Sequence, residues 1–327
     1  MTFSIIVPLY NARDYFEECV ASVRSQAIAD WELVVVNDGS TDDSGALADR
    51  LAKKDPRIRV FHQDNAGQFF ARRRGIAEAT GEYLLFLDSD DWYRPHALEA
   101  LADCIAAHHP DIVMFGGERM TAAGGTGKCV GSFSAESGTV DKTALYEAFL
   151  SSYAFNSMCL KAFRRSLFEG DNTEYSFLKG VGYGEDKVMN LYPLTRAETV
   201  YSLADTLYNY RVNEQSVTKE LSLEEIPSML GNHVFAAVYR AMQAWGMDDP
   251  AHREAIAAHY LQNFGLFFYE IKKRCDTADK KKAFAHYPWR QALDPQALRY
   301  LGSKRLDAKT KWKLKLALYC TSLAVRL

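Results

Sequence analysis

The 327-residue sequence lacks several features that would place it in a common class of protein. Its longest apolar runs, such as residues 83–87, fall far short of the roughly 20 residues that span a bilayer. No basic segment precedes the first apolar run, so we expect no signal peptide. The six cysteines are scattered, with none within five residues of another, which excludes a zinc knuckle or a Cys-x-x-Cys redox pair. The composition, 48% hydrophobic and 25% charged, excludes collagen-like, coiled-coil and disordered chains.

Charge is spread unevenly along the chain. The net charge is only −3, but residues 271–327 carry 15 Lys/Arg against 4 Asp/Glu, and the remaining 270 residues carry 24 against 38. The basic segment fits either a solvated helix face or a surface that seeks anionic lipid or another polyanion. Because scattered thiols suit a reducing compartment, we expect a cytoplasmic protein. The basic segment makes peripheral attachment to the inner face of the plasma membrane one interpretation. We expect no nucleic-acid partner.

Strand and helix signals alternate over residues 3–115, which predicts a parallel α/β sheet covered on both faces. Residues 116–138 are rich in Gly, Ser and Thr and are interpreted as a long loop or irregular insertion. After about residue 222 the pattern is helical. The predicted domains are therefore 1–218, the α/β domain, and 219–327, a helical region with a basic tail. The predicted strands of the first domain are residues 3–7, 32–36, 58–61, 83–87 and 111–115.

Polar side chains follow each of the first four predicted strands. Ligands of open parallel sheets bind beyond the carboxyl ends of the strands, and here those ends bring Asp38, Asp64 and residues 88–91 to one edge. These carboxylates would repel one another without a cation. Hard oxygen ligands of this kind point to Mg²⁺ or Mn²⁺, shared with substrate phosphates.

Two other nucleotide-binding folds are disfavoured by the turn after the first strand. A dinucleotide-binding domain needs a glycine-rich turn there, and residues 8–13 contain no glycine. The sequence also has no Gly-Lys-Ser/Thr phosphate loop. A sugar nucleotidyltransferase would share the sheet but would carry a glycine-rich, arginine-containing loop at the same place.

Four ordered motifs together carry a specific resemblance. They are residues 5–11 (IIVPLYN), 36–42 (VNDGSTD), 65–67 (NAG) and 86–91 (FLDSDD). In this order and spacing they resemble the family 2 glycosyltransferases of bacterial cell-surface glycan assembly. These are inverting enzymes that use sugar nucleotides and have the GT-A fold. The resemblance covers about residues 1–215, and the later residues match only the habit of such enzymes of ending in helices.

The resemblance implies a nucleotide site built from the first three motifs. Pro8 and Tyr10 would line the nucleobase pocket, with the Tyr10 ring available for stacking. Asp38 would accept a hydrogen bond from the uracil N3–H, for which a carboxylate is a suitable acceptor. Asn65 and Gly67 would complete the nucleotide-sugar site.

The resemblance also assigns the Asp-x-Asp motif. Asp88 would lie near the ribose, with Ser89 beside it, and Asp90 would hold the metal on the diphosphate. Asp91 is more simply interpreted as a cap before the next element than as a ligand. Arg72 matches the family arginine of an Ala-Arg-Asn-x-Gly stretch that follows the third motif. In this sequence Arg73 replaces the asparagine, and Arg74 comes next. Since a helix turns ~100° per residue, one of these three arginines must face solvent.

Inversion needs a carboxylate that takes the proton from an acceptor hydroxyl. Glu185 and Asp186 resemble the family's Glu-Asp motif at a helix start, with Asp186 in the role of general base and Glu185 nearby. Alternatively, both carboxylates simply favour the helix N-terminus. The segment from Tyr208 to Arg211 either closes over the diphosphate or is an edge strand with a surface arginine.

The sequence thus predicts an inverting, metal-dependent glycosyltransferase, of hexosyl or N-acetylhexosaminyl type, that moves a sugar from a UDP-sugar to a glycan or lipid-linked hydroxyl. The alternative is a catalytically inactive protein of the same fold that binds nucleotide-sugar or glycan. A glycoside hydrolase also pairs carboxylates but needs no nucleotide pocket.

At the basic end, Trp312, Leu316, Tyr319 and Leu323 share one side of a predicted helix that is rich in lysine. This helix either lies on a membrane or packs on the protein body.

Overall fold

The computed structural model describes residues 3–121, 124–152, 154–179, 184–212, 232–274 and 293–319, with isolated residues between 277 and 290. The chain forms two compact units. The boundary predicted between residues 218 and 219 lies outside the described residues. The first unit comprises Met1–Phe149, Tyr153–Gly180 and Met189–Glu214, and the second comprises Leu150–Ser152, Val181–Val188 and Gln215–Leu327.

A mixed sheet forms the centre of the first unit. Its strands are β1 (Phe3–Leu9), β2 (Trp31–Asp38), β3 (Ile58–Gln63), β4 (Tyr83–Phe86), β5 (Trp92–Tyr93), β6 (Ile112–Thr121), β7 (Gly124–Val130), β8 (Gly138–Thr139), β9 (Lys161–Arg164) and β10 (Val200–Arg211). The order across the sheet is β3-β2-β1-β4-β9-β6-β10-β5, with β7 paired to β6 and β8 to β10. Strands β1 to β4 are parallel, as predicted. Strand β9 runs antiparallel between β4 and β6, so the sheet is not purely parallel.

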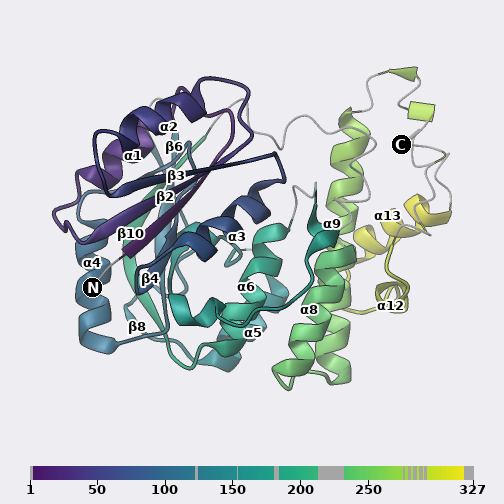
Figure 1. Cartoon of the computed structure of the whole chain (residues 1–327). Helices are drawn as coiled ribbons and strands as arrows, with labels where there is room; N and C mark the ends of the chain where they lie inside the picture. Colours follow the sequence, from purple (N-terminus) through teal and green to yellow (C-terminus); the bar gives the residue numbers. More distant parts are fainter. Residues whose placement is uncertain are drawn as a thin grey trace. The chain divides into compact units, whose positions relative to one another are not determined.

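Helices cover both faces of this sheet, as predicted. They are α1 (Phe16–Arg24), α2 (Ser44–Ala52), α3 (Gln68–Glu78) and α4 (Ala97–His108). Two further helices, α5 (Lys142–Ser151) and α6 (Glu185–Arg196), each have residues in both units. Helices α1 and α4 share a face, because the Leu98 amide donates to Gln26 Oε1 at 3.1 Å just beyond α1. Helix α3 packs on β1 and β2 from the other face (Figure 1). Every residue of β1 and β2 is buried.

A glycine sets how closely α3 approaches the sheet. A Cβ added to Gly75 would lie 2.3 Å from Cγ2 of Ile6 in β1, closer than any real contact. Only a residue without a side chain therefore lets the helix backbone rest on the strand. This close approach holds α3 against β1.

The segment predicted as a long loop is largely a hairpin. Strand β6 continues to Thr121, and β7 returns antiparallel to it, with Gly117 opposite Val130. The glycine-rich composition of residues 116–138 therefore wrongly indicated a loop. Strand β7 has no hydrophobic alternation, and its pairing with β6 holds it in the sheet.

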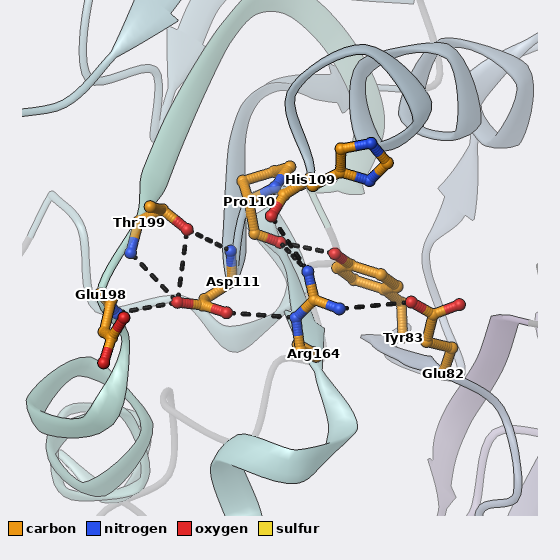
Figure 2. A network of polar contacts seen from close by, with 8 residues as sticks. All are labelled: Glu82, Tyr83, His109, Pro110, Asp111, Arg164, Glu198 and Thr199. Atoms are coloured by element: carbon orange, nitrogen blue, oxygen red, sulfur yellow. Dashed lines mark hydrogen bonds and ion pairs between the residues drawn. The ribbon is translucent and has the colours of Figure 1, made fainter.

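A polar network lies where β6 and β10 begin (Figure 2), at the end of the sheet opposite the Asp-x-Asp motif. Arg164 at the end of β9 donates to Asp111 Oδ1 at 3.1 Å and to the carbonyl oxygen of His109 at 3.0 Å. The second oxygen of Asp111 accepts from the Glu198 and Thr199 amides at 2.8 and 3.1 Å. One carboxylate thus joins the starts of β6 and β10 to β9, which fixes these strands far from the polar loops.

The described part of the second unit is helical, as predicted. Its helices are α8 (Asn232–Ala244), α9 (Pro250–Arg274), α12 (Pro295–Leu298) and α13 (Ala308–Tyr319). Helices α8, α12 and α13 all pack on α9 (Figure 1). Within the described residues, no helix combines the length and the hydrophobicity that crossing a bilayer requires.

Candidate functional site

The loops after β1 and β2 are bound to each other. Asn11 adopts a positive φ of 48°, and its Oδ1 accepts from the Thr41 amide at 2.8 Å. In return the Asn11 amide donates to Ser40 Oγ at 3.1 Å. Pro8 is buried in β1, whereas Tyr10 at the end of that strand is 47% exposed. The structure therefore places the Tyr10 ring at the surface of a loop with a fixed backbone, where a planar ligand could stack on it.

Asp38 ends β2 and is almost fully buried. Its Oδ1 accepts from Gln63 Nε2 at 2.8 Å and from the Ala66 amide at 2.9 Å. Its Oδ2 accepts from the Gly67 amide at 2.8 Å. A carboxylate has about four acceptor positions, so these three donors leave room for one further donor. Asp38 thus holds the third motif in place.

The third motif ends where α3 begins. Asn65 is exposed, and Gly67 has a φ of 93° with open space around the position of a Cβ. The positive φ favours glycine at this position. With no side chain here, the surface beside the N-terminus of α3 stays open.

Two residues of α3 bind the first aspartate of the Asp-x-Asp motif. Arg72 Nη2 lies 2.7 Å from Asp88 Oδ1, and Gln68 Nε2 donates to the same oxygen at 2.8 Å. Arg72 is 1% exposed, and Arg74 is the arginine that faces solvent, as expected. Residues 68 and 72 are one helical turn apart, so they share a face. Gln68 is absent from the predicted site residues, although this spacing from Arg72 could have identified it.

Negative charge accumulates in the loop after β4. Burial, and then the neighbouring Asp88 carboxylate, raise the pKa of Asp90 to about 6. Burial, Asp88 and Asp90 also raise the pKa of Asp91 well above its ordinary value. In the described part of the chain, one of the three carboxylates Asp88, Asp90 and Asp91 makes an ion pair, which joins Asp88 to Arg72. A further cation would therefore stabilise the ionised loop.

The end of β10 binds this loop through four hydrogen bonds. The Asp88 amide donates to Tyr208 Oη at 3.2 Å, and that hydroxyl donates to Asp91 Oδ2 at 2.8 Å. The Arg211 amide donates to Asp91 Oδ1 at 2.7 Å, and Arg211 Nε donates to the Asp90 carbonyl oxygen at 2.8 Å. Asp91 is 4% exposed. It is therefore the buried anchor that joins the Asp-x-Asp loop to β10, rather than a cap.

Arg211 is fixed on several sides. Its guanidinium lies 4.5 Å from the Trp92 ring centroid and 4.9 Å from that of Tyr15, and it donates to Glu18 at 2.5 Å. Strand β10 is also not the edge strand that we considered, because it lies between β6 and β5. These contacts place a positive charge beside Asp90, at the edge of the sheet where the motifs meet.

Glu185 and Asp186 begin α6, directly after Gly184 with its φ of 77°. Both are half-buried. They belong to the second unit, and the two units are not placed relative to each other. The adjacent Lys187 is buried and donates to the Ser152 carbonyl oxygen at 3.2 Å. Burial lowers the pKa of Lys187 to about 7. The geometry of the first unit thus brings together the predicted nucleotide and metal residues, and it does not bear on the predicted base.

The residues present fit a divalent cation that is held partly by the protein and partly by substrate phosphates. In the described part of the chain, no group of three or more His, Cys, Asp or Glu side chains could enclose a metal ion. Mg²⁺ and related ions are often held by one or two carboxylates together with substrate phosphates. Asp88 and Asp90 offer oxygen donors for that arrangement, with Oδ1 of Asp88 already engaged by α3.

Comparison with known proteins gives a family match. The family model described as glycosyl transferase family 2 matches residues 4–170. An uncharacterised glycosyltransferase of Bacillus subtilis, EpsJ, is 34% identical over 221 residues, and the putative glycosyltransferase EpsH of the same organism is 30% identical over 221 residues. Each match covers 66% of this chain and 62% of the relative, so it spans less than two thirds of the relatives' length.

Solved structures share the fold. Staphylococcus aureus TarS (residues 1–349, in complex with UDP-GlcNAc) superposes with a TM-score of 0.70 at 19% identity, over 100% of this chain and 92% of that one. The mannosyltransferase PcManGT of Pyrobaculum calidifontis, in complex with GDP-Man and Mn²⁺, gives a TM-score of 0.51 at 15% identity, over 96% and 85% of the two chains. At these identities the likeness concerns the fold, and it confirms the GT-A architecture with a helical C-terminal region.

Proposed function

The chain belongs to glycosyl transferase family 2, and on that premise we propose that it transfers a sugar from a UDP-sugar to a hydroxyl of a glycan or lipid-linked acceptor, with inversion. The observation that carries this proposal is the edge where the loops after β1, β2 and β4 meet. There an exposed aromatic ring, a buried carboxylate with one spare acceptor position and an under-neutralised Asp-x-Asp loop lie on one rigid sheet.

The nucleoside would occupy the surface formed by the first three motifs. Tyr10 offers its exposed ring to the base, and Pro8, buried beneath it, fixes the end of the strand. Asp38 has one acceptor position left after its three internal bonds, which suits the N3–H of uracil. Asn65 and Gly67 border the path from the base toward the sugar.

The diphosphate would lie over the loop after β4. Asp90 would hold Mn²⁺ or Mg²⁺, and this ion supplies positive charge to the leaving diphosphate when it is bound. Asp88, oriented by Arg72 and Gln68, would face the ribose together with Ser89. Arg211 adds a fixed positive charge beside Asp90, and such preorganised charge stabilises a leaving group in the transition state.

Transfer with inversion is a single displacement. The acceptor oxygen attacks the anomeric carbon, the bond from that carbon to the diphosphate breaks, and its electron pair leaves with UDP. The acceptor proton passes to a carboxylate, which we assign to Asp186, with Glu185 as its neighbour. Assembly of cell-surface polysaccharide, at the inner face of the plasma membrane, is the process that we propose for this reaction.

The direct test is a screen of UDP-sugars for release of UDP. The purified chain is incubated with UDP-glucose, UDP-galactose, UDP-GlcNAc or UDP-GalNAc, with Mn²⁺, with Mg²⁺ or with EDTA. We expect slow hydrolysis of one donor class that depends on the metal. UDP binding without any turnover, even with acceptor extracts, would favour the inactive binding protein instead. Absence of UDP binding would contradict the nucleotide site itself.

A further inference from the structure

Helix α13 in the second unit packs through one side only. Leu314 and Leu318 are buried, and the helix lies on α9. These two leucines are four residues apart, so they form one edge of the helix. The side of α13 that carries Leu314 and Leu318 therefore packs on α9, and Trp312 lies on a different side.

The opposite side of the same helix carries an exposed tryptophan. Trp312 is 54% exposed. At ~100° per residue it lies about 200° from Leu314, on the far side of the helix axis. By the same count, positions 316 and 319 lie within about 40° of Trp312 and hold Leu316 and Tyr319. Positions 312, 316 and 319 therefore form a second row along the helix, on a different side from Leu314 and Leu318.

Basic residues flank this second row. Lys309 and Lys315, both exposed, lie roughly 50–70° to either side of the row at ~100° per residue. Residues 293–319 together contain seven Lys/Arg and two Asp. Two exposed lysines thus flank Trp312 on α13, in a segment that carries a net positive charge.

We propose that this face of α13, defined by Trp312, Lys309 and Lys315 and the positions of Leu316 and Tyr319, docks on an anionic phospholipid bilayer. Tryptophan partitions into the headgroup region of a bilayer, and lysines beside it are attracted to anionic lipid. The proposal goes beyond the transfer reaction, because it concerns a surface of the second unit and needs no catalysis.

Charge and composition favour this occupant over two others. Lysine is depleted at the cores of protein–protein interfaces, so a tryptophan flanked by Lys309 and Lys315 is a poor surface for a second copy of the chain. A soluble polyanion would engage the lysines but gives no reason for an exposed tryptophan at the centre of the patch. An anionic bilayer engages both.

The experiment measures partitioning of the full chain onto vesicles. Sedimentation is compared for equal parts of phosphatidylglycerol and phosphatidylcholine and for phosphatidylcholine alone, at low and at high salt. The variants are Trp312→Ala and the double change Lys309→Gln with Lys315→Gln. The matched control is Lys53→Gln with Lys54→Gln, which removes the same charge from two exposed lysines of the first unit.

We expect binding to the anionic vesicles only, weakened by salt. Each lysine near such a surface is worth about fivefold in partitioning, so the α13 double change should weaken binding about 25-fold and the control not at all. Trp312→Ala should weaken it about tenfold, and wild-type Trp fluorescence should shift to the blue with vesicles while the variant's should not.

Thermal unfolding of each variant shows whether it is folded, and metal-dependent hydrolysis of a UDP-sugar is measured on the same samples. Equal loss in the control variant, or binding of wild type unaffected by Trp312→Ala, would overturn the proposed face. So would wild-type protein that ignores anionic vesicles. Hydrolysis in the same samples reports separately on the proposed function, so the two proposals can fail independently.

Discussion

Replacing Tyr208 by Phe should loosen the Asp-x-Asp loop, because one hydroxyl serves two of its residues. Tyr208 Oη donates to Asp91 Oδ2 and accepts from the Asp88 amide, and the side chain is fully buried. Losing the buried hydrogen bond to Asp91 costs about 1 kcal/mol, and the buried Asp88 amide, left without a partner, adds about 1–3 kcal/mol. We expect about 3 kcal/mol in all, which is a fall in Tm of roughly 6–12 °C for a unit of this size.

The assay pairs thermal unfolding with calorimetry of UDP in the presence of Mn²⁺. Tyr210→Phe is the matched control, since its hydroxyl bonds to Ser157 Oγ at 2.5 Å. The control should lose about 1 kcal/mol and keep its UDP affinity, whereas Tyr208→Phe should bind UDP roughly tenfold more weakly, about 1.4 kcal/mol. Adding Asp91→Asn to Tyr208→Phe should cost less than the sum of the two single changes. Equal Tm values and equal UDP affinities for the two phenylalanine variants would refute the role of Tyr208.

Three further outcomes follow from individual carboxylates and their partners. Asp186→Asn should keep UDP affinity and lose transfer by ~10²-fold or more, the usual size of a general-base effect; unchanged turnover would move the base elsewhere. Arg72→Met should lower stability by about 3 kcal/mol, because it leaves the carboxylate of Asp88 without its cation, and a wild-type Tm would contradict the pairing. Burial would raise the pKa of Glu32, but four hydrogen bonds lower it from 4.5 to about 2, so Glu32→Gln should cost about 3 kcal/mol at neutral pH. Because the folded pKa is the lower one, that difference should be constant above pH 4.5 and shrink as the pH falls toward 2, as denaturant unfolding across this range would show.

The strands that carry the site could be predicted because a buried strand shows as a short apolar run in the local sequence. Strands β1 and β2 are largely apolar runs between polar turns, and the polar residues that end them could be assigned to the same end of the sheet from topology alone. The hairpin of β6 and β7 could not be predicted in this way, because its glycine-rich strand is held by pairing with a neighbour and carries no periodic signal of its own.

The role of Asp91 could not be predicted for a different reason. Its partners Tyr208 and Arg211 lie 117 and 120 residues further along the chain, so no local pattern reveals them. The sequence could predict only in part which of Arg72, Arg73 and Arg74 is buried. Helical spacing requires one of them to face solvent, but the contact between Gly75 and Ile6 decides which arginine is buried.

The central claim is that Asp90 binds a divalent cation together with the diphosphate of a UDP-sugar, and calorimetry of UDP tests it most directly. Wild type, Asp90→Ala and Asp103→Ala are titrated with UDP in Mn²⁺ and in EDTA; Asp103 is an exposed aspartate of α4 and serves as the matched control. We expect wild type and Asp103→Ala to bind UDP at least about tenfold more tightly, about 1.4 kcal/mol, with Mn²⁺ than without it, and Asp90→Ala to lose that difference. The same gain from Mn²⁺ in Asp90→Ala as in wild type would contradict the claim.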